Sequence, residues 1–204
     1  MTDVTDPPTH ATHATLAQDA EDRLLVWLPA DPAQRALADE YVAFVRAAGA
    51  AAVARDGGPE HLTASCFVLT PDLTHVLLCY HRKGQFWVQL GGHVEATDVS
   101  MAAAAYREAR EEGGIVALHT PDPLPVDVDR HGLSGSFGAC RTHWDVGFVA
   151  FADEAAVPVT SAESEDVAWF AVDALPGRTP PGFGDRLATV LAELLHRRAA
   201  PAAT

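Results

Sequence analysis

The segment Gly91–Ile115 constrains this chain more than any other, because it ends in a helix crowded with carboxylates. It reads GGHVEATDVSMAAAAYREAREEGGI, which is a glycine pair, a short loop and a helix predicted from about Val99 to Glu112. At about 3.6 residues per turn, Glu108, Glu111 and Glu112 fall on one side of that helix. Two unit charges about 4 Å apart cost on the order of 4 kcal/mol at an effective dielectric constant near 20. Such a cluster is relieved by protonation, by splaying into water or by binding a cation.

Two interpretations of this patch compete. Hard carboxylate oxygens favour Mg²⁺, Mn²⁺ or Ca²⁺, whereas a solvated acidic helix end with Arg107 paired to Glu111 needs no ligand. The surrounding sequence favours the cation. Gly91–Gly92 allows backbone groups to approach a ligand closely, and the alanine-rich stretch Met101–Ala105 allows the helix to pack tightly on a neighbouring sheet.

The segment resembles the Nudix box of the Nudix hydrolases, usually written Gly-x5-Glu-x7-Arg-Glu-U-x-Glu-Glu-x-Gly-U, where U is apolar. Gly92 takes the place of the glycine, 107–112 that of the Arg-Glu-U-x-Glu-Glu core, and 114–115 that of the closing pair. Asp98 stands where the first glutamate is expected, and eight residues rather than seven separate it from the arginine. Leu90 replaces a proline that many members have before the double glycine. Because the extra residue precedes the core, we expect the carboxylate patch to be preserved.

The resemblance covers about residues 55–175, including His61–Ser65, which is similar to one bacterial subgroup of the family. It implies an α/β/α sandwich with a mixed sheet and a hydrolase that cleaves a pyrophosphate bond in a nucleoside diphosphate derivative, a nucleoside triphosphate or a similar small diphosphate. It also implies a divalent ion, Mg²⁺ or Mn²⁺. The implied metal ligands are Glu108, Glu111, Glu112 and a glycine carbonyl, that of Gly92 or Gly91, with Arg107 orienting the carboxylates.

Further residues are candidates for contact with substrate. A basic turn follows one predicted strand, and a solvated turn explains it equally well. One glutamate lies just after the glycine pair, a strand carries a histidine and an aspartate on one face, and two glutamates precede another strand. These residues are His81, Arg82, Lys83, Glu95, His143, Asp145, Glu163 and Glu165.

Two other functions share the implied fold. An isomerase of the isopentenyl diphosphate type needs a catalytic cysteine, but Cys66 lies in an apolar strand and no clear cysteine motif of that kind is present. A non-catalytic nucleotide-sensing module would not need all three glutamates. Release of phosphate or pyrophosphate separates hydrolysis from both alternatives.

Composition restricts the partners. With 14 Lys and Arg against 28 Asp and Glu, the formal charge is −14, and no basic run is present to neutralise a nucleic-acid polymer. A small phosphorylated substrate remains compatible, because bound cations supply positive charge locally. The three cysteines form no Cys-x-x-Cys pair, and no apolar stretch is long enough for a membrane span, so we expect a cytoplasmic protein. The resemblance also allows a homodimer, because family members are often dimers.

The chain divides into four expected parts: a disordered tail over 1–18, a helical extension over 19–58, the Nudix domain over 59–200 and a tail over 201–204. In the extension, Asp31 and Pro32 start a helix that ends near Gly49. The remaining patterns predict strands at 62–69, 76–80, 86–90, 115–119, 142–151 and 166–172, a loop or hairpin at 131–140 and an amphipathic helix at 183–198.

Overall fold

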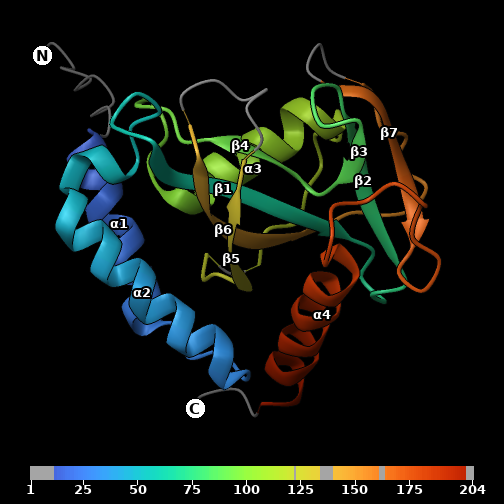
Figure 1. The fold of residues 1–204 in the computed structure, drawn as a ribbon. Helices are drawn as coiled ribbons and strands as arrows, with labels where there is room; N and C mark the ends of the chain where they lie inside the picture. The colour runs from blue at the N-terminus through green and yellow to red at the C-terminus, as the bar shows by residue number, and fades with distance from the viewer. Residues whose placement is uncertain (1–11, 122, 134–139, 161–163, 201–204) are drawn as a thin grey trace, which may run out of the picture.

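The computed structural model describes residues 12–121, 123–133, 140–160 and 164–200. Figure 1 shows a curled sheet with helices on both sides of it. Within the described part of the chain, no helix has the length and apolarity needed to cross a membrane. The elements are α1 (His13–Val26), α2 (Pro32–Ala48), η1 (Gly49–Ala52), β1 (Glu60–Leu69), β2 (His75–His81), β3 (Phe86–Val88), β4 (Leu90–His93), α3 (Met101–Gly113), β5 (Asp127–Gly132), β6 (Thr142–Phe151), β7 (Ser164–Ala171) and α4 (Phe183–Ala199).

Strand β1 organises the sheet because it pairs with three other strands. It runs parallel to β6 along its whole length, from Glu60 opposite Thr142 to Leu69 opposite Phe151. Its middle residues, 63–66, pair with β4 and its last two residues pair with β2, both antiparallel. The main path is β3-β2-β1-β6-β5, with β7 pairing with β2. The predicted α/β/α sandwich with a mixed sheet is therefore confirmed.

The alternation of side chains along β1 separates the two layers. Leu62 and Cys66 belong to the core cluster that the sheet forms with α1, α2 and α3. Phe67 and Leu69 belong to a second cluster, formed with α4. On this second face the first half of the strand is polar, because it carries His61, Thr63 and Ser65. The uncommon polar half of an otherwise apolar strand marks the part of the sheet where a site can form.

The amino-terminal helices pack against the flank of the sheet. Asp31 caps α2 by accepting a hydrogen bond from the amide of Ala33, as predicted, and the helix ends at Gly49. The Tyr41 hydroxyl donates to the carbonyl of Asp145 over 3.1 Å. The prediction of a disordered tail over 1–18 was wrong for 13–18, which form the start of α1 and bury Leu16 and Ala17. Residues 1–11 and 201–204 lie outside the described residues.

Three local predictions were wrong or incomplete. The strand expected at 86–90 is divided into β3 and β4, and the glycine pair lies within β4. The strand expected at 115–119 forms only a single bridge, between His119 and Phe151, because the amide of Leu118 bonds back to Val116. Strand β5 was missed, since its sequence DVDRHG lacks apolar alternation.

Gly91 allows β4 to lie against β1. Its φ is 154°, and a Cβ atom there would lie 2.6 Å from the Cα of Ser65. We expect Gly91→Ala to lower the free energy of unfolding by about 1–3 kcal/mol, because the added methyl group overpacks the strand pair. Gly177→Ala is the matched control, because that site is open and its φ is ordinary, and the change expected there is within about 0.5 kcal/mol. Urea unfolding measures both, and equal effects would contradict the close approach of the two strands.

Candidate functional site

Helix α3 positions the carboxylate patch. The Ser100 hydroxyl caps its first turn by accepting from the amide of Ala103, and Gly114 ends it in the left-handed conformation. The small side chains of Ala102, Ala105 and Ala109 are buried, so the helix lies close to the sheet. The patch is thereby fixed beside β4.

Arg107 is the hub of the patch. Its Nε and Nη2 donate to both oxygens of Asp98, each over 2.9 Å, and Nη1 donates to Glu108 and Glu111, each over 3.0 Å. Nη2 also donates to the carbonyl of His93 over 3.0 Å. Asp98 is only 5% exposed and also accepts from the amide of Glu95. Asp98 thus holds the arginine in a bidentate pair despite the extra residue in the loop.

The three glutamates occupy different environments. Glu112 is buried and accepts from the amide of Gly91 over 2.9 Å. Glu108 lies against Gly92, where a Cβ atom would come within 2.8 Å of its carboxylate carbon. Glu111 is 58% exposed. Glu108 at Gly92 and Glu112 at Gly91 therefore bring carboxylate oxygens to the backbone of β4, and oxygen donors of this kind suit a hard divalent cation.

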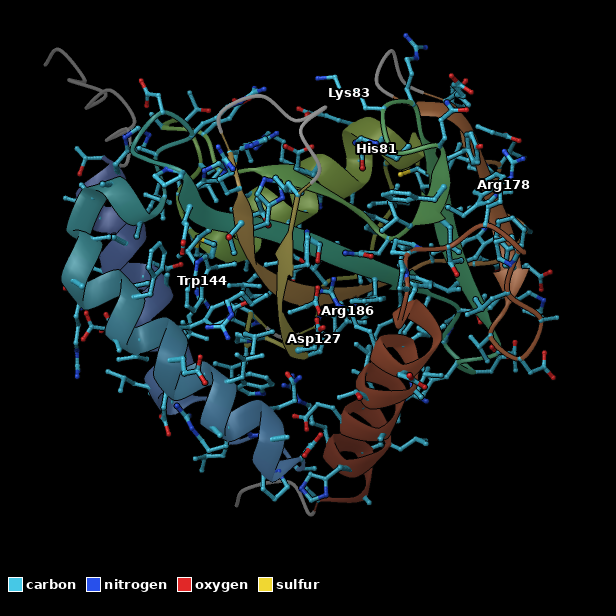
Figure 2. All side chains as sticks on the ribbon, viewed as in Figure 1. His81, Lys83, Asp127, Trp144, Arg178 and Arg186 are labelled. Atoms are coloured by element: carbon cyan, nitrogen blue, oxygen red, sulfur yellow. The ribbon has the colours of Figure 1, made fainter. Side chains whose placement is uncertain are left out.

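The other predicted substrate contacts lie in several places. His81 accepts from the amide of Gly84 over 2.9 Å and so closes the basic turn, in which Arg82 and Lys83 are exposed. Figure 2 shows His81 and Lys83 well separated from Asp127 and Arg186. The positive charge of Lys83 contributes, after burial and other cationic groups, to lowering the pKa of His93 to about 4.

The candidate glutamates outside the carboxylate patch differ in their contacts. Glu95 is exposed, with one carboxylate oxygen 4.0 Å from Nη1 of Arg107. Glu165 lies at the bulge where β7 meets the end of β2, and accepts from Gln85 over 3.4 Å. Glu163 lies outside the described residues. Of the two downstream glutamates, only Glu165 therefore has a position, and it is beside the basic turn.

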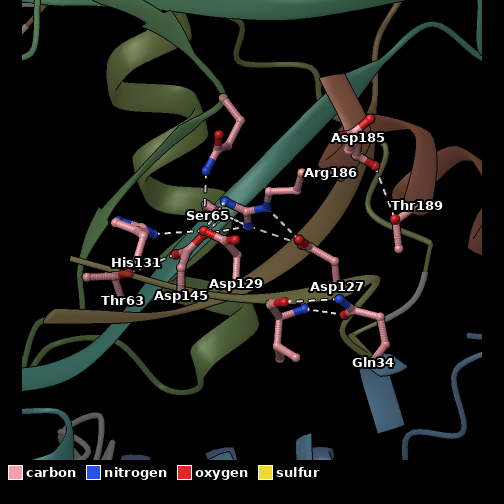
Figure 3. Close-up of polar contacts among 12 residues, drawn as sticks. Gln34, Thr63, Ser65, Asp127, Asp129, His131, Asp145, Asp185, Arg186 and Thr189 are labelled. Carbon is pink, nitrogen blue, oxygen red and sulfur yellow. Dashed lines mark hydrogen bonds and ion pairs between the residues drawn. The ribbon is translucent and has the colours of Figure 1, made fainter. Parts of the chain in front are cut away.

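Asp145 is the centre of a buried polar network on the second face of the sheet (Figure 3). It accepts from Thr63 over 2.8 Å, from Ser65 over 2.6 Å and from Arg186 of α4 over 2.7 Å. Burial alone would raise the pKa of Asp145, but Arg186 and the Ser65 hydroxyl outweigh it and lower that pKa. Arg186 also pairs with Asp127 over 2.5 Å. Both oxygens of Asp145 are thus engaged by protein donors.

Arg186 was not among the residues singled out in the sequence. The sequence feature that could have identified it is a single arginine close to Phe183 and Leu187, on the apolar face of an amphipathic helix that packs on the sheet. The alternating Asp127 and Asp129 supplied the matching charges. Only the register between β5 and β6, which sets Asp129 opposite Asp145, brings these groups together.

His143 lies next to three other histidines. Its ring centroid is 5.1 Å from that of His61, 5.5 Å from that of His93 and 5.6 Å from that of His131. Burial, followed by the charges of neighbouring histidines, lowers the pKa of His143 to about 3. At neutral pH this ring is therefore uncharged.

One known protein family matches most of the chain. The family model described as NUDIX domain matches residues 59–194. No curated protein matches the chain.

Several solved structures are similar in fold. A NUDIX-family hydrolase from Clostridium perfringens is 23% identical, with a TM-score of 0.52, over 66% of this chain and 97% of that chain. The E. coli dihydroneopterin triphosphate pyrophosphohydrolase is 16% identical, with a TM-score of 0.52, over 64% of this chain and 95% of that one. A UDP-X diphosphatase is 14% identical, with a TM-score of 0.53, over 92% of this chain and 97% of that one. The last similarity extends beyond the part that the family model matches.

The polar network makes the stability of the fold depend on Arg186. We expect Arg186→Met to lower the free energy of unfolding by about 3–5 kcal/mol, because it leaves Asp127 and Asp145 buried without their cation. Arg46→Met, which removes an exposed pair with Glu21, should change it by at most about 1 kcal/mol. Urea unfolding at pH 7 measures both variants. A small effect of both substitutions would show that the buried charges do not depend on Arg186.

Proposed function

The chain belongs to the Nudix hydrolase family, and we propose that it is a divalent-metal-dependent enzyme that cleaves a pyrophosphate bond in a small diphosphate compound. The compounds proposed are a nucleoside diphosphate derivative, a nucleoside triphosphate or a similar diphosphate. The observation that carries the proposal is the position of Glu108 against Gly92 and of Glu112 at the amide of Gly91. Arg107, fixed by Asp98, holds Glu108 and Glu111 on the same side of α3.

We assign the metal ligands to Glu108, Glu111, Glu112 and the carbonyl of Gly92, and the ion to Mg²⁺ or Mn²⁺. A bound divalent ion neutralises charge on the phosphate oxygens and orients the attacking water. The protein's own contribution is to fix its carboxylates. Arg107 holds Glu108 and Glu111, and the amide of Gly91 holds Glu112. Ligands held in this way do not need to reorganise when a cation binds.

We assign recognition of the substrate phosphates to Arg82 and Lys83. Both side chains are exposed on a turn whose backbone is fixed by His81. Glu95 and Glu165 would then border the site, the first next to Arg107 and the second next to the turn.

The similar structures support this bond type through their fold. The titles of two of them name a diphosphatase and a triphosphate pyrophosphohydrolase. The compounds named there differ in the group attached to the phosphates. We therefore propose the diphosphate as the shared element and leave the attached group to experiment.

The structure weighs against an isomerase of the isopentenyl diphosphate type. Cys66 is fully buried on the face of β1 that packs toward α3, and burial raises the pKa of its thiol. A thiol in that position cannot reach a substrate. A non-catalytic sensing module is disfavoured by the same ordered carboxylates that support hydrolysis.

Loss of a single box carboxylate should remove most of the turnover. We expect Glu111→Gln and Glu112→Gln each to lower kcat roughly 100-fold or more, equivalent to about 3 kcal/mol of transition-state stabilisation, while the fold is kept. Glu154→Gln is a matched control for Glu111→Gln, because both side chains are 58% exposed and both lie near a basic group. Near-normal turnover in both box variants would remove the box from the mechanism.

Activity should also depend on an added divalent ion. Purified chain is incubated with a panel of diphosphate compounds and Mg²⁺, and mass spectrometry identifies the products and the bond that is cleaved. We expect a chelator to abolish the reaction and excess Mg²⁺ or Mn²⁺ to restore it, because the carboxylates need a cation to bind phosphate. Hydrolysis that resists the chelator would contradict the metal requirement, and a shifted double bond without phosphate release would identify an isomerase.

A further inference from the structure

Three histidines from three strands meet on the second face of the sheet. His61 of β1 lies opposite His143 of the parallel strand β6, and His93 ends β4, opposite Thr63. One ring nitrogen from each histidine lies within 4.8 Å of the others. No two of the three residues are close in sequence. The cluster is therefore produced by strand register alone.

This cluster is separate from the box carboxylates, although the two are adjacent in sequence. Successive side chains of a strand point to opposite faces of the sheet. Gly92 lies opposite Ala64 and against Glu108, on the side of α3. His93 lies opposite Thr63, on the side of the polar network. Strand β4 therefore separates an oxygen-rich site from a nitrogen-rich one.

The three rings are sheltered from solvent. His61 is 1% exposed, and His93 and His143 are partly buried beside it. Among the described residues, none of the three rings forms an ion pair with a carboxylate. Three imidazoles with ring nitrogens in one place, none of them paired with a carboxylate of the described residues, suit a bound cation.

The chemistry of the donors selects the cation. Imidazole nitrogen suits zinc, copper, nickel and iron, whereas Mg²⁺ and Ca²⁺ prefer oxygen. With Zn–N distances of about 2.0–2.1 Å, tetrahedral nitrogens lie about 3.4 Å apart, so small side-chain rotations close the present spacing. Cys140 borders the same rings, with its Sγ 3.6 Å from Nδ1 of His61. A soft sulfur at this place adds to the preference for zinc over magnesium.

We propose that His61, His93 and His143 bind a divalent transition metal ion of the zinc type, at a site distinct from the Nudix box. Three protein ligands leave one tetrahedral position for Cys140, for water or for an anionic oxygen. The site does not depend on the proposed hydrolase activity, because it is defined by binding alone.

Metal content tests the proposal directly. The full chain, free of any affinity tag, is stripped with a chelator, incubated with Zn²⁺ in the presence of excess Mg²⁺, desalted and measured by elemental analysis. We expect one zinc ion per chain. His143→Asn and His93→Asn should each weaken zinc binding roughly 100-fold or more, because each removes one of three ligands. Co²⁺ in place of Zn²⁺ should give visible absorption bands that both variants lose.

Two controls separate this site from other histidines and from the box. His119→Asn should keep full zinc binding, because its ring stacks on Phe151 outside the cluster. Glu112→Gln should also keep one zinc ion, even if turnover is lost. Wild-type protein without stoichiometric zinc, unchanged affinity in His143→Asn, or loss of zinc in Glu112→Gln would each overturn the proposal. Urea unfolding of each variant shows that a lost ion does not reflect a lost fold.

Discussion

The parallel pairing of β1 with β6 is the constraint on which the rest of the structure depends. Ten consecutive pairs lock the two strands in one register, so every side chain of both is assigned to a face. One face is apolar along its length and receives α3 and the amino-terminal helices. The other is apolar where Phe183 and Leu187 of α4 pack, and polar in the first half of β1, where Ser65 donates to Asp145. A shift by one residue would exchange the two faces and destroy both the core and the polar groups.

Like charges are tolerated in this chain because each cluster is organised around a single arginine. Arg107 gathers Asp98, Glu108 and Glu111, and Arg186 gathers Asp127 and Asp145. The two differ in what they leave open. The network of Arg186 is enclosed, so its charges serve the fold, whereas Glu111 remains largely exposed and can take a ligand. Because the net charge is −14, the remaining repulsion between carboxylates has to be reduced by bound cations or by solvent.

Much of this arrangement follows from the sequence, and the remainder requires the fold. Helical spacing places the box glutamates on one side of α3, and alternation predicts β6 with its observed bounds. Spacing does not show that Glu112 is buried against Gly91, or that Asp98 still reaches Arg107 across a longer loop. The histidine cluster was not predictable either, because sequences 30 and more residues apart become neighbours only through strand order. Polar strand β5 was missed for a related reason, since its pairing with β6 compensates for its weak apolar pattern.

The end of β4 shows how one backbone can serve two kinds of chemistry. Gly92 has no side chain, so the helix that carries Glu108 approaches the strand closely on one side. His93 directs its ring to the other side, while its carbonyl accepts from Arg107 and so remains tied to the box. An ion held by the three imidazoles would therefore restrain the same peptide that helps to position the arginine. Metal binding to the histidines on one face of β4 would then change how rigidly the carboxylates are held on the other face, because His93 contributes to both sites.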